Sequence, residues 1–231
     1  KVIKIHKDLV FVFLDSQWWL QDWSKEKKMN RGCEIKTRGD FLKTVEEIFT
    51  EHKNDEIVVL MHHPIKSNGL HGGNFNLAHH IFPLHEKNIW FPLPIIGSIY
   101  PIYRQVTGSK QDITNVHNIE VVGGVESIAK RLGVNAIFAA GHEHGLQYFN
   151  GNKLKYIVSG GGSKQTYTKK GGEAEYARDG RGYARIQFHE DNEAWIEFFT
   201  VAGFGQMPKL EYRAQLREAR AGTVPEPIDY P

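Results

Sequence analysis

An apolar segment of the sequence ends on two adjacent histidines. Residues 58–73 read VVLMHHPIKSNGLHGG, so a β-branched run passes directly into His62 and His63 and then into a proline and several glycines. In α/β sheets, functional side chains gather beyond the carboxyl ends of the strands. An imidazole at this place is either a polar residue that merely ends the strand or a ligand for a metal ion such as zinc, manganese or iron.

A second stretch shows the same combination. In residues 139–145, AAGHEHG, an apolar segment leads into His142 and His144, and a glycine stands on each side of the pair. Residues two apart in extended backbone project to the same side, so both imidazoles could reach one ion or two neighbouring ions. Together with His62, they predict a metal site whose ligands are His62, His142 and His144. The alternative is that these histidines only pack or face solvent.

The segments that precede the histidines are predicted to be strands of one sheet. Runs of β-branched and aromatic residues are typical of buried strands, and apolar residues that recur every three or four positions are typical of helices. Asp40 is expected to cap the first helix, and Gly133 is expected to end the second. By these patterns the strands are residues 9–15, 56–61 and 135–140, and the helices are residues 40–53 and 121–132.

The last third of the chain is predicted to form antiparallel hairpins. NGNK at 150–153 is typical of a hairpin turn, and EDN separates the strand-like segments GYARIQFH and EAWIEFFTV. Strands and helices that alternate and then give way to hairpins favour a mixed α/β layered fold. Residues 211–222, EYRAQLREARAG, are expected to form a terminal helix, and the prolines after them to form a tail or linker.

Residues 64–110 form a long excursion between these elements. The segment is rich in proline, glycine and aromatic residues and has no sustained period. A long ordered loop inside a compact domain is usually functional, and the many aromatics argue against disorder. We therefore expect this loop to cover the histidines.

Composition limits the possible functions. The chain has 231 residues, enough for one large domain or two small ones, and its formal charge of +2 gives no general case for nucleic acid or an anionic membrane as a partner. Its single cysteine, Cys33, excludes an internal disulfide. No apolar run reaches the roughly 18–20 residues of a membrane span. Because the chain begins with Lys1 and shows no signal peptide, we expect a processed product or a piece of a longer protein.

The two histidine stretches resemble motifs of the calcineurin-like metallophosphoesterases, the superfamily that includes the purple acid phosphatases. That family places His-x-Pro after one strand and Gly-His-x-His after a later strand; here these are MHHP at 61–64 and GHEH at 141–144. LDSQWWLQDW, HGGNF, FPLPIIGSIYPIYR and IVSGGGSK are similar to a bacterial, envelope-associated branch in which the domain can precede an outer-membrane β-barrel. The resemblance covers about residues 9–200. It implies a layered αββα sandwich and a place in the periplasm or at the outer-membrane surface.

The resemblance also implies roles for particular residues. His62, His142 and His144 would be metal ligands in a site for two ions, drawn from zinc, manganese or iron, and His63 would be a catalytic residue that faces the substrate or a residue that supports the ligands. The substrate would be a phosphoester, and the guanidinium of Arg104 suits bidentate binding of phosphate. The residues of the long loop that could contact this substrate are His71, Ser98, Tyr100 and Arg104, and Ser163 and Lys164 could border the same opening.

The chain departs from the family in its first part. The earlier motifs, Asp-x-His, Gly-Asp-x-x-Asp and Gly-Asn-His-Glu/Asp, supply the remaining ligands and the proton donor, and the sequence does not contain them; Asp8, Asp15 and Asp22 lack their context. Residues 1–205 are therefore expected to be the C-terminal part of a metallophosphoesterase domain whose N-terminal half is a necessary partner. Residues 206–231 are expected to be a terminal helix with a proline-rich tail or linker.

A different class of function remains open. The chain could be a catalytically inactive subunit that keeps the fold and serves as a scaffold in a cell-envelope assembly. Its contact surfaces would then be the aromatic loop, the basic residues 24–31 and the proline-rich tail. A lone zinc-binding module is a weaker third interpretation, because three histidines are few for a closed structural site.

Overall fold

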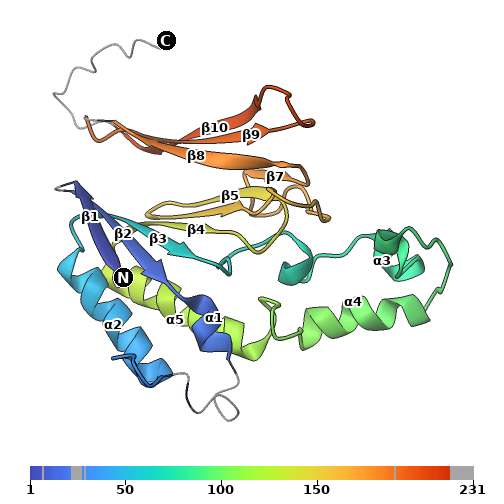
Figure 1. The fold of residues 1–231 in the computed structure, drawn as a ribbon, viewed down its shortest axis with the longest axis horizontal. Helices are drawn as coiled ribbons and strands as arrows, with labels where there is room; N and C mark the ends of the chain where they lie inside the picture. The colour runs from blue at the N-terminus through green and yellow to red at the C-terminus, as the bar shows by residue number, and fades with distance from the viewer. Residues whose placement is uncertain (7, 22–27, 29, 190, 219–231) are drawn as a thin grey trace.

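The computed structural model describes residues 1–6, 8–21, 28, 30–189 and 191–218 of the chain (Figure 1). In these residues the strands are β1 (Val2–His6), β2 (Leu9–Leu14), β3 (Glu56–Met61), β4 (Asn135–Ala140), β5 (Leu146–Gly151), β6 (Leu154–Ser159), β7 (Tyr176–Arg178), β8 (Gly182–Phe188), β9 (Ala194–Thr200) and β10 (Lys209–Arg217). The α-helices are α1 (Ser16–Leu20), α2 (Arg38–Glu51), α3 (Leu77–Ile81), α4 (Ile96–Val106) and α5 (Val116–Leu132), and short 3-10 turns lie at Leu70–Gly72 and His85–Lys87.

The strands form two sheets. The larger sheet has seven strands in the order β1-β2-β3-β4-β6-β5-β7, and its central strands β2, β3, β4 and β6 run parallel. The smaller sheet has the order β10-β9-β8 and is antiparallel. Helices α2 and α5 cover one face of the larger sheet, and the smaller sheet lies over the other face (Figure 1). The described residues thus form three layers, and the predicted mixed α/β fold with hairpins at its end is confirmed.

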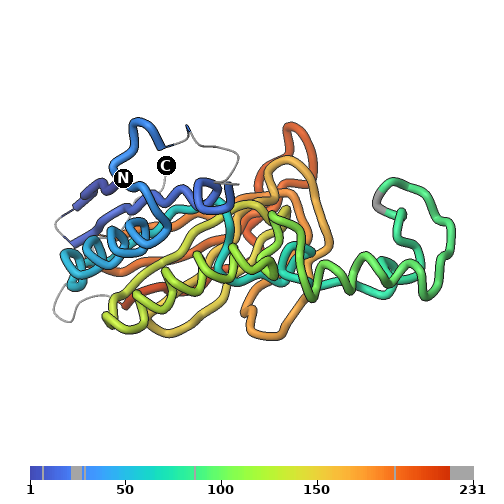
Figure 2. The backbone as a smooth tube through the Cα atoms, turned by 90° about the horizontal axis from the view of Figure 1, so that it is seen from below, coloured from blue at the N-terminus to red at the C-terminus, as the bar shows by residue number. Residues whose placement is uncertain are grey.

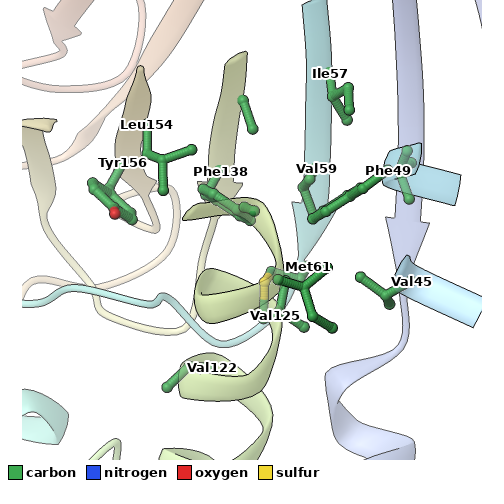
Figure 3. Packing of buried hydrophobic residues seen from close by; sticks show 14 of the residues in the cluster. Val45, Phe49, Ile57, Val59, Met61, Val122, Val125, Phe138, Leu154 and Tyr156 are labelled. Carbon is green, nitrogen blue, oxygen red and sulfur yellow. The ribbon is translucent and has the colours of Figure 1, made fainter. Parts of the chain in front are cut away.

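Each face of the larger sheet has its own hydrophobic core. Between the sheet and the helices, Phe49 of α2 and Val125 of α5 pack against Val59 of β3 (Figure 3). Between the two sheets, Tyr148 meets Phe198 and its neighbours on β9. Strands buried on both faces need apolar residues at every position, which explains the continuous runs in β2, β3 and β4.

Local sequence sets the ends of the two long helices. The side chain of Thr37 accepts a hydrogen bond from the backbone N–H of Asp40, and the Asp40 carboxylate accepts one from the N–H of Thr37, which makes a capping box at the start of α2. Asp40, the predicted N-cap, is therefore a residue of the first turn. Helix α5 begins at Val116, earlier than the predicted 121, and ends as predicted at Gly133 in a left-handed conformation.

The predicted terminal helix is wrong over 211–218, the part of it that the structure describes. Lys209–Arg217 forms β10, which pairs with β9 on the far side of the predicted domain boundary at residue 205. Tyr212, Ala214 and Leu216 pack into the core between the sheets, so the segment has the period of a strand. Its arginine, glutamine and leucine favour a helix in isolation, but pairing with β9 and burial of alternate side chains decide the outcome. The predicted tail lies outside the described residues.

The long excursion is not a loop that covers the histidines. Residues 74–108, which we call the arm, contain α3 and α4 and project away from the two sheets (Figures 1 and 2). Pro101 stands inside α4, and a proline within an apolar segment argues against a helix when sequence is the only guide. Only the part of the excursion before the arm and the part after it return to the sheet.

Among the described residues, the structure has no helix with the combined length and apolar character that crossing a bilayer requires.

Candidate metal centre

The two histidine stretches follow neighbouring strands. Strands β3 and β4 are parallel and in register, with Met61 opposite Ala140. The chain leaves both strands at the same level, where the N–H of Gly141 donates to the carbonyl of His62 at 3.2 Å. His62 and His142 are therefore brought together by strand register, as the sequence predicts for side chains at the carboxyl edge of a parallel sheet.

The nitrogens of these histidines are close enough to share an ion. His62, His63 and His142 each offer a ring nitrogen, and these nitrogens all lie within 4.8 Å of one another. Nε2 of His62 and Nδ1 of His142 are 3.1 Å apart. Two imidazoles bound to one zinc-like ion, each at about 2.0–2.1 Å, have nitrogens about 3 Å apart. The spacing of this pair is that of a hydrogen bond between the two rings, and it also fits a shared ion.

His142 is held with one nitrogen directed toward His62. Its Nε2–H donates to the backbone carbonyl of Gln111 at 2.7 Å, which leaves the lone pair on Nδ1 facing His62. Metal-bound histidines typically donate their second nitrogen to such an acceptor. The backbone of His142 is left-handed, with φ of 65°, a conformation that costs a side-chain-bearing residue about 1 kcal/mol or more. Residues 142–145 therefore bend, and the extended geometry predicted for His142 and His144 is wrong.

His63 has no free nitrogen. It is fully buried, its Nδ1 accepts from the hydroxyl of Ser16 at 2.9 Å, and its Nε2–H donates to the side-chain oxygen of Gln111 at 2.9 Å. The same hydroxyl accepts the backbone N–H of His63 at 3.2 Å. His63 was a candidate for direct catalysis, but this geometry favours a supporting role, because its ring fixes Gln111 and so fixes His142.

The segment after the arm carries two residues that sequence reasoning missed. Gln111 contacts both histidine stretches, through its side chain to His63 and through its carbonyl to His142. The next residue, Asp112, is fully buried and accepts hydrogen bonds from Nδ1 of His71 at 2.8 Å and from Nε of Arg104 at 2.9 Å. Burial opposes ionisation of Asp112, but the hydrogen bonds from Arg104 and His71 hold its pKa well below the usual range. A polar loop that supports a distant site leaves no pattern in the sequence.

Two of the residues predicted to contact the substrate, His71 and Arg104, have different surroundings. The ring of His71 lies 4.2 Å from the ring of His142, and His71 lines the cleft described below. Arg104 lies almost wholly buried at the base of the arm, where Nε and Nη2 of its guanidinium donate to the carboxylate of Asp112. This gives Arg104 a positioning role in place of the phosphate contact that the sequence predicts.

Glu143, the residue between the two histidines of GHEH, joins two turns of the site. Its Oε1 accepts from the hydroxyl of Ser67 at 2.7 Å and from the N–H of Gly72 at 3.0 Å, so the turn that carries His71 is fixed to the turn that carries His142. Burial raises the pKa of Glu143. A Cβ at Gly160 would lie 2.0 Å from the carbonyl oxygen of Glu143, which shows how closely these turns pack.

An open cleft of about 490 Å³ lies over these side chains. Its lining includes His144, whose ring is not part of the group within 4.8 Å, and Ser163, which was predicted to border the opening. Lys164 lies near enough to His144 to lower its pKa, after the larger effect of burial. Ser98 and Tyr100 lie on α4 in the arm, and they are not among the residues that line the cleft: His62, His71, His142, His144, Ser159, Gly160, Gly162 and Ser163.

Burial keeps the ring of His142 in its neutral form. Burial, followed by the nearby His71 and His63, lowers the pKa of His142 to about 3. Burial also lowers the pKa of His63 and of His144. A metal ion binds the neutral imidazole, so His142 and His144 are ready to coordinate at physiological pH. Among the described residues, the group of ring nitrogens within 4.8 Å contains imidazoles and no carboxylate. Because a pair of ions would need carboxylate ligands, this group fits one ion better than two.

Comparison with solved structures places the fold. GAP50, the anchor in the inner membrane complex of Plasmodium, matches with a TM-score of 0.52 and 12% sequence identity over 95% of this chain and 54% of its own length. Purple acid phosphatase PPD1 from yellow lupin (Lupinus luteus) seeds matches with a TM-score of 0.47 and 10% identity over 92% of this chain and 32% of its own. No protein-family model and no curated protein sequence matches the chain.

The likeness to GAP50 shows the fold. At 12% identity it assigns no role to any residue. The chain spans about half the length of GAP50 and about a third of the length of the lupin phosphatase.

Proposed function

We propose that the chain is part of a metal-dependent phosphoester hydrolase. The observation that carries this proposal is the 3.1 Å spacing between Nε2 of His62 and Nδ1 of His142, at the carboxyl ends of two parallel strands in register. His142 has the carbonyl partner expected of a ligand, and its neutral ring leaves the lone pair on Nδ1 for an ion. His144 on the wall of the cleft would be a further ligand, and zinc, manganese and iron suit such a donor set.

Besides the ligands for a metal ion, the chain supplies His71 as a group that would contact the substrate. A metal ion bound here would act as a Lewis acid on a phosphoryl oxygen. His71, with its Nδ1 on Asp112, presents the other side of its ring to the same cleft, where Nε2 can donate to a phosphoryl oxygen or pass a proton to the leaving group. The contact between Nδ1 and Asp112 fixes the orientation of the His71 ring. Arg104 in turn neutralises Asp112.

The active site is proposed to be completed by residues outside this chain. A phosphoesterase with two ions needs carboxylate ligands, and the close group in the described part of the chain contains none. We infer that an N-terminal half of the same domain supplies the carboxylates and binds at the cleft. The chain alone is therefore expected to hydrolyse p-nitrophenyl phosphate negligibly, even with manganese or zinc added, and addition of the preceding half is expected to restore turnover.

Metal binding can be tested without activity. Cobalt(II) titrated into the purified chain is expected to give absorption bands of an imidazole-bound ion, and inorganic phosphate is expected to change them. His62→Ala and His142→Ala should each weaken binding by about a hundredfold or more. The control is His117→Ala, which removes a half-exposed histidine on α5 whose ring pairs with the nearby Glu120.

The result that would overturn the proposal is specific. If the wild-type chain binds cobalt no better than His62→Ala and His142→Ala do, the histidines are structural, and a non-catalytic scaffold becomes the better description. Binding that is lost equally in His117→Ala would likewise reject the cleft as the site.

A further inference from the structure

Helix α4 turns its apolar side away from the protein. Ile99 and Ile102 are more than half exposed, and Val106 is 76% exposed. Aliphatic and aromatic residues at i, i+3, i+4 and i+7 make a continuous apolar stripe, which a globular protein normally directs to its core. We call this stripe the outer face of α4, and it consists of Ile96, Ile99, Tyr100, Ile102, Tyr103 and Val106.

The side of α4 that faces the protein is small or polar. Gly97, Pro101 and Arg104 are its buried residues, and Gly97 approaches the carbonyl of His80 in α3 so closely that a Cβ would lie 2.3 Å from that oxygen. Arg104 is fixed by Asp112. The helix therefore buries its small and polar side and exposes its apolar side. The contacts of Gly97 and Arg104 fix this orientation, because the bulky residues of the apolar side could not make them. Exposure of the outer face is a property of the fold.

The connection between α3 and α4 also exposes apolar side chains. Ile89, Trp90 and Phe91 are exposed near the end of the arm, with Trp90 at 63%. The arm stands clear of the two sheets in both views (Figures 1 and 2). So many exposed apolar residues on one arm mark an interaction site, because single exposed apolar residues are common and clusters of them are not.

The composition of the arm favours a lipid surface as its partner. Tryptophan and tyrosine beside aliphatic residues are the side chains found at membrane–water interfaces. Residues 77–106 contain one acidic residue, whereas the whole chain has 27 in 231, so little negative charge opposes contact with anionic headgroups. Helix α4 is about 16 Å long, which suits a helix lying in the plane of the headgroups. A protein partner would need a groove that encloses this convex arm, whereas a headgroup layer closes around it by itself.

We propose that the arm docks the protein on a lipid bilayer, with the outer face of α4 and Trp90 in the interfacial region. The proposal does not rest on the metal site. The two are nevertheless connected in the fold, because Arg104 on the inner side of α4 binds Asp112, which holds His71 at the cleft. Docking of the arm would therefore hold the cleft at a fixed distance from the lipid surface.

The test is flotation of the full chain with phospholipid vesicles. Vesicles of phosphatidylcholine, with and without phosphatidylglycerol, are expected to carry the wild-type chain to the top of a density gradient. Ile99→Glu combined with Ile102→Glu should reduce the bound fraction at least about tenfold, because two charges would enter the apolar interface. The matched control is Phe204→Glu combined with Met207→Glu, which adds the same charges at exposed apolar residues between β9 and β10.

Tryptophan fluorescence tests whether Trp90 enters the interfacial region of the bilayer. On addition of vesicles, the emission of the wild-type chain is expected to shift to shorter wavelength, and Trp90→Phe is expected to remove that shift while leaving the circular dichroism unchanged. Failure of the wild-type chain to float would overturn the proposal, and so would equal flotation of the Ile99/Ile102 variant. Concentration-dependent self-association that the same variant abolishes, without vesicle binding, would assign the surface to a second copy of the chain and also reject the lipid proposal.

Discussion

Asp112 connects the arm to the cleft through a single buried carboxylate. It receives Arg104 from α4, His71 from the cleft and the backbone N–H of Ser109 at 2.7 Å. The pair formed with Arg104 is almost wholly removed from water. Removal of one partner from such a pair is costly, since the other charge then remains buried without compensation.

Asp112→Asn is therefore expected to lower the free energy of unfolding by about 3–5 kcal/mol at neutral pH, measured by urea denaturation. The pKa of Asp112 in the folded state lies below the ordinary value of 3.8. The carboxylate therefore stabilises the fold fully above pH 3.8, and this contribution is lost as the pH falls from 3.8 toward the folded-state pKa. The difference between wild type and variant should therefore narrow in acid. Glu120→Gln, at an exposed pair with His117, is the control and should change stability by less than about 0.5 kcal/mol. A difference that stayed constant at low pH would contradict this account of Asp112.

At the scale of elements, the turns after β4 and β6 are packed backbone to backbone. Gly160 follows β6, and its Cα lies against the carbonyl of Glu143, where a Cβ would come within 2.0 Å. Gly162, two residues later, has open space around the same position. Both glycines line the cleft. They differ in how tightly their Cα atoms are packed, and this makes them a matched pair for substitution.

Gly160→Ala is expected to displace the turn that carries His142 and to destabilise the fold by about 2–4 kcal/mol, because the new methyl group would meet backbone that cannot rotate away. Cobalt affinity should fall together with stability. Gly162→Ala is the matched control and should leave both quantities nearly unchanged. Equal behaviour of the two variants in thermal denaturation would show that the turn is more adaptable than the structure indicates.

The sequence predicts those elements whose signal is local. The strands before His62 and His142 are continuous apolar runs, and their parallel register follows from strands that alternate with helices. Strand β10 was missed because its residues favour a helix and only pairing with β9 makes it a strand. The arm was missed because Pro101 stands within α4, and a proline argues against a helix when sequence is the only guide. The support that Gln111 gives to His142 joins residues 31 positions apart and leaves no periodicity to recognise.

At the scale of the whole molecule, the larger sheet is shared by two cores. The helices pack on one face and the smaller sheet on the other, so neither outer layer has a core of its own without the seven strands between them (Figure 1). Tyr148 on β5 packs in the core between the sheets, whereas the next residue, Phe149, packs in the core against the helices. A strand with side chains in both cores couples them, and the chain is expected to unfold as one cooperative unit.

Phe198→Ala tests this coupling. Phe198 lies fully buried on β9 between the two sheets, and its removal should cost about 3–5 kcal/mol in unfolding free energy. Circular dichroism at the helical signal and fluorescence of Trp195 on β9 should still report one shared midpoint, shifted to lower temperature, because the smaller sheet cannot separate without exposing the larger one. Phe204→Ala, at a fully exposed phenylalanine, should leave the midpoint within about 1 °C. Two separate midpoints in Phe198→Ala would mean that the smaller sheet unfolds on its own, and that the site at the edge of the larger sheet does not depend on it.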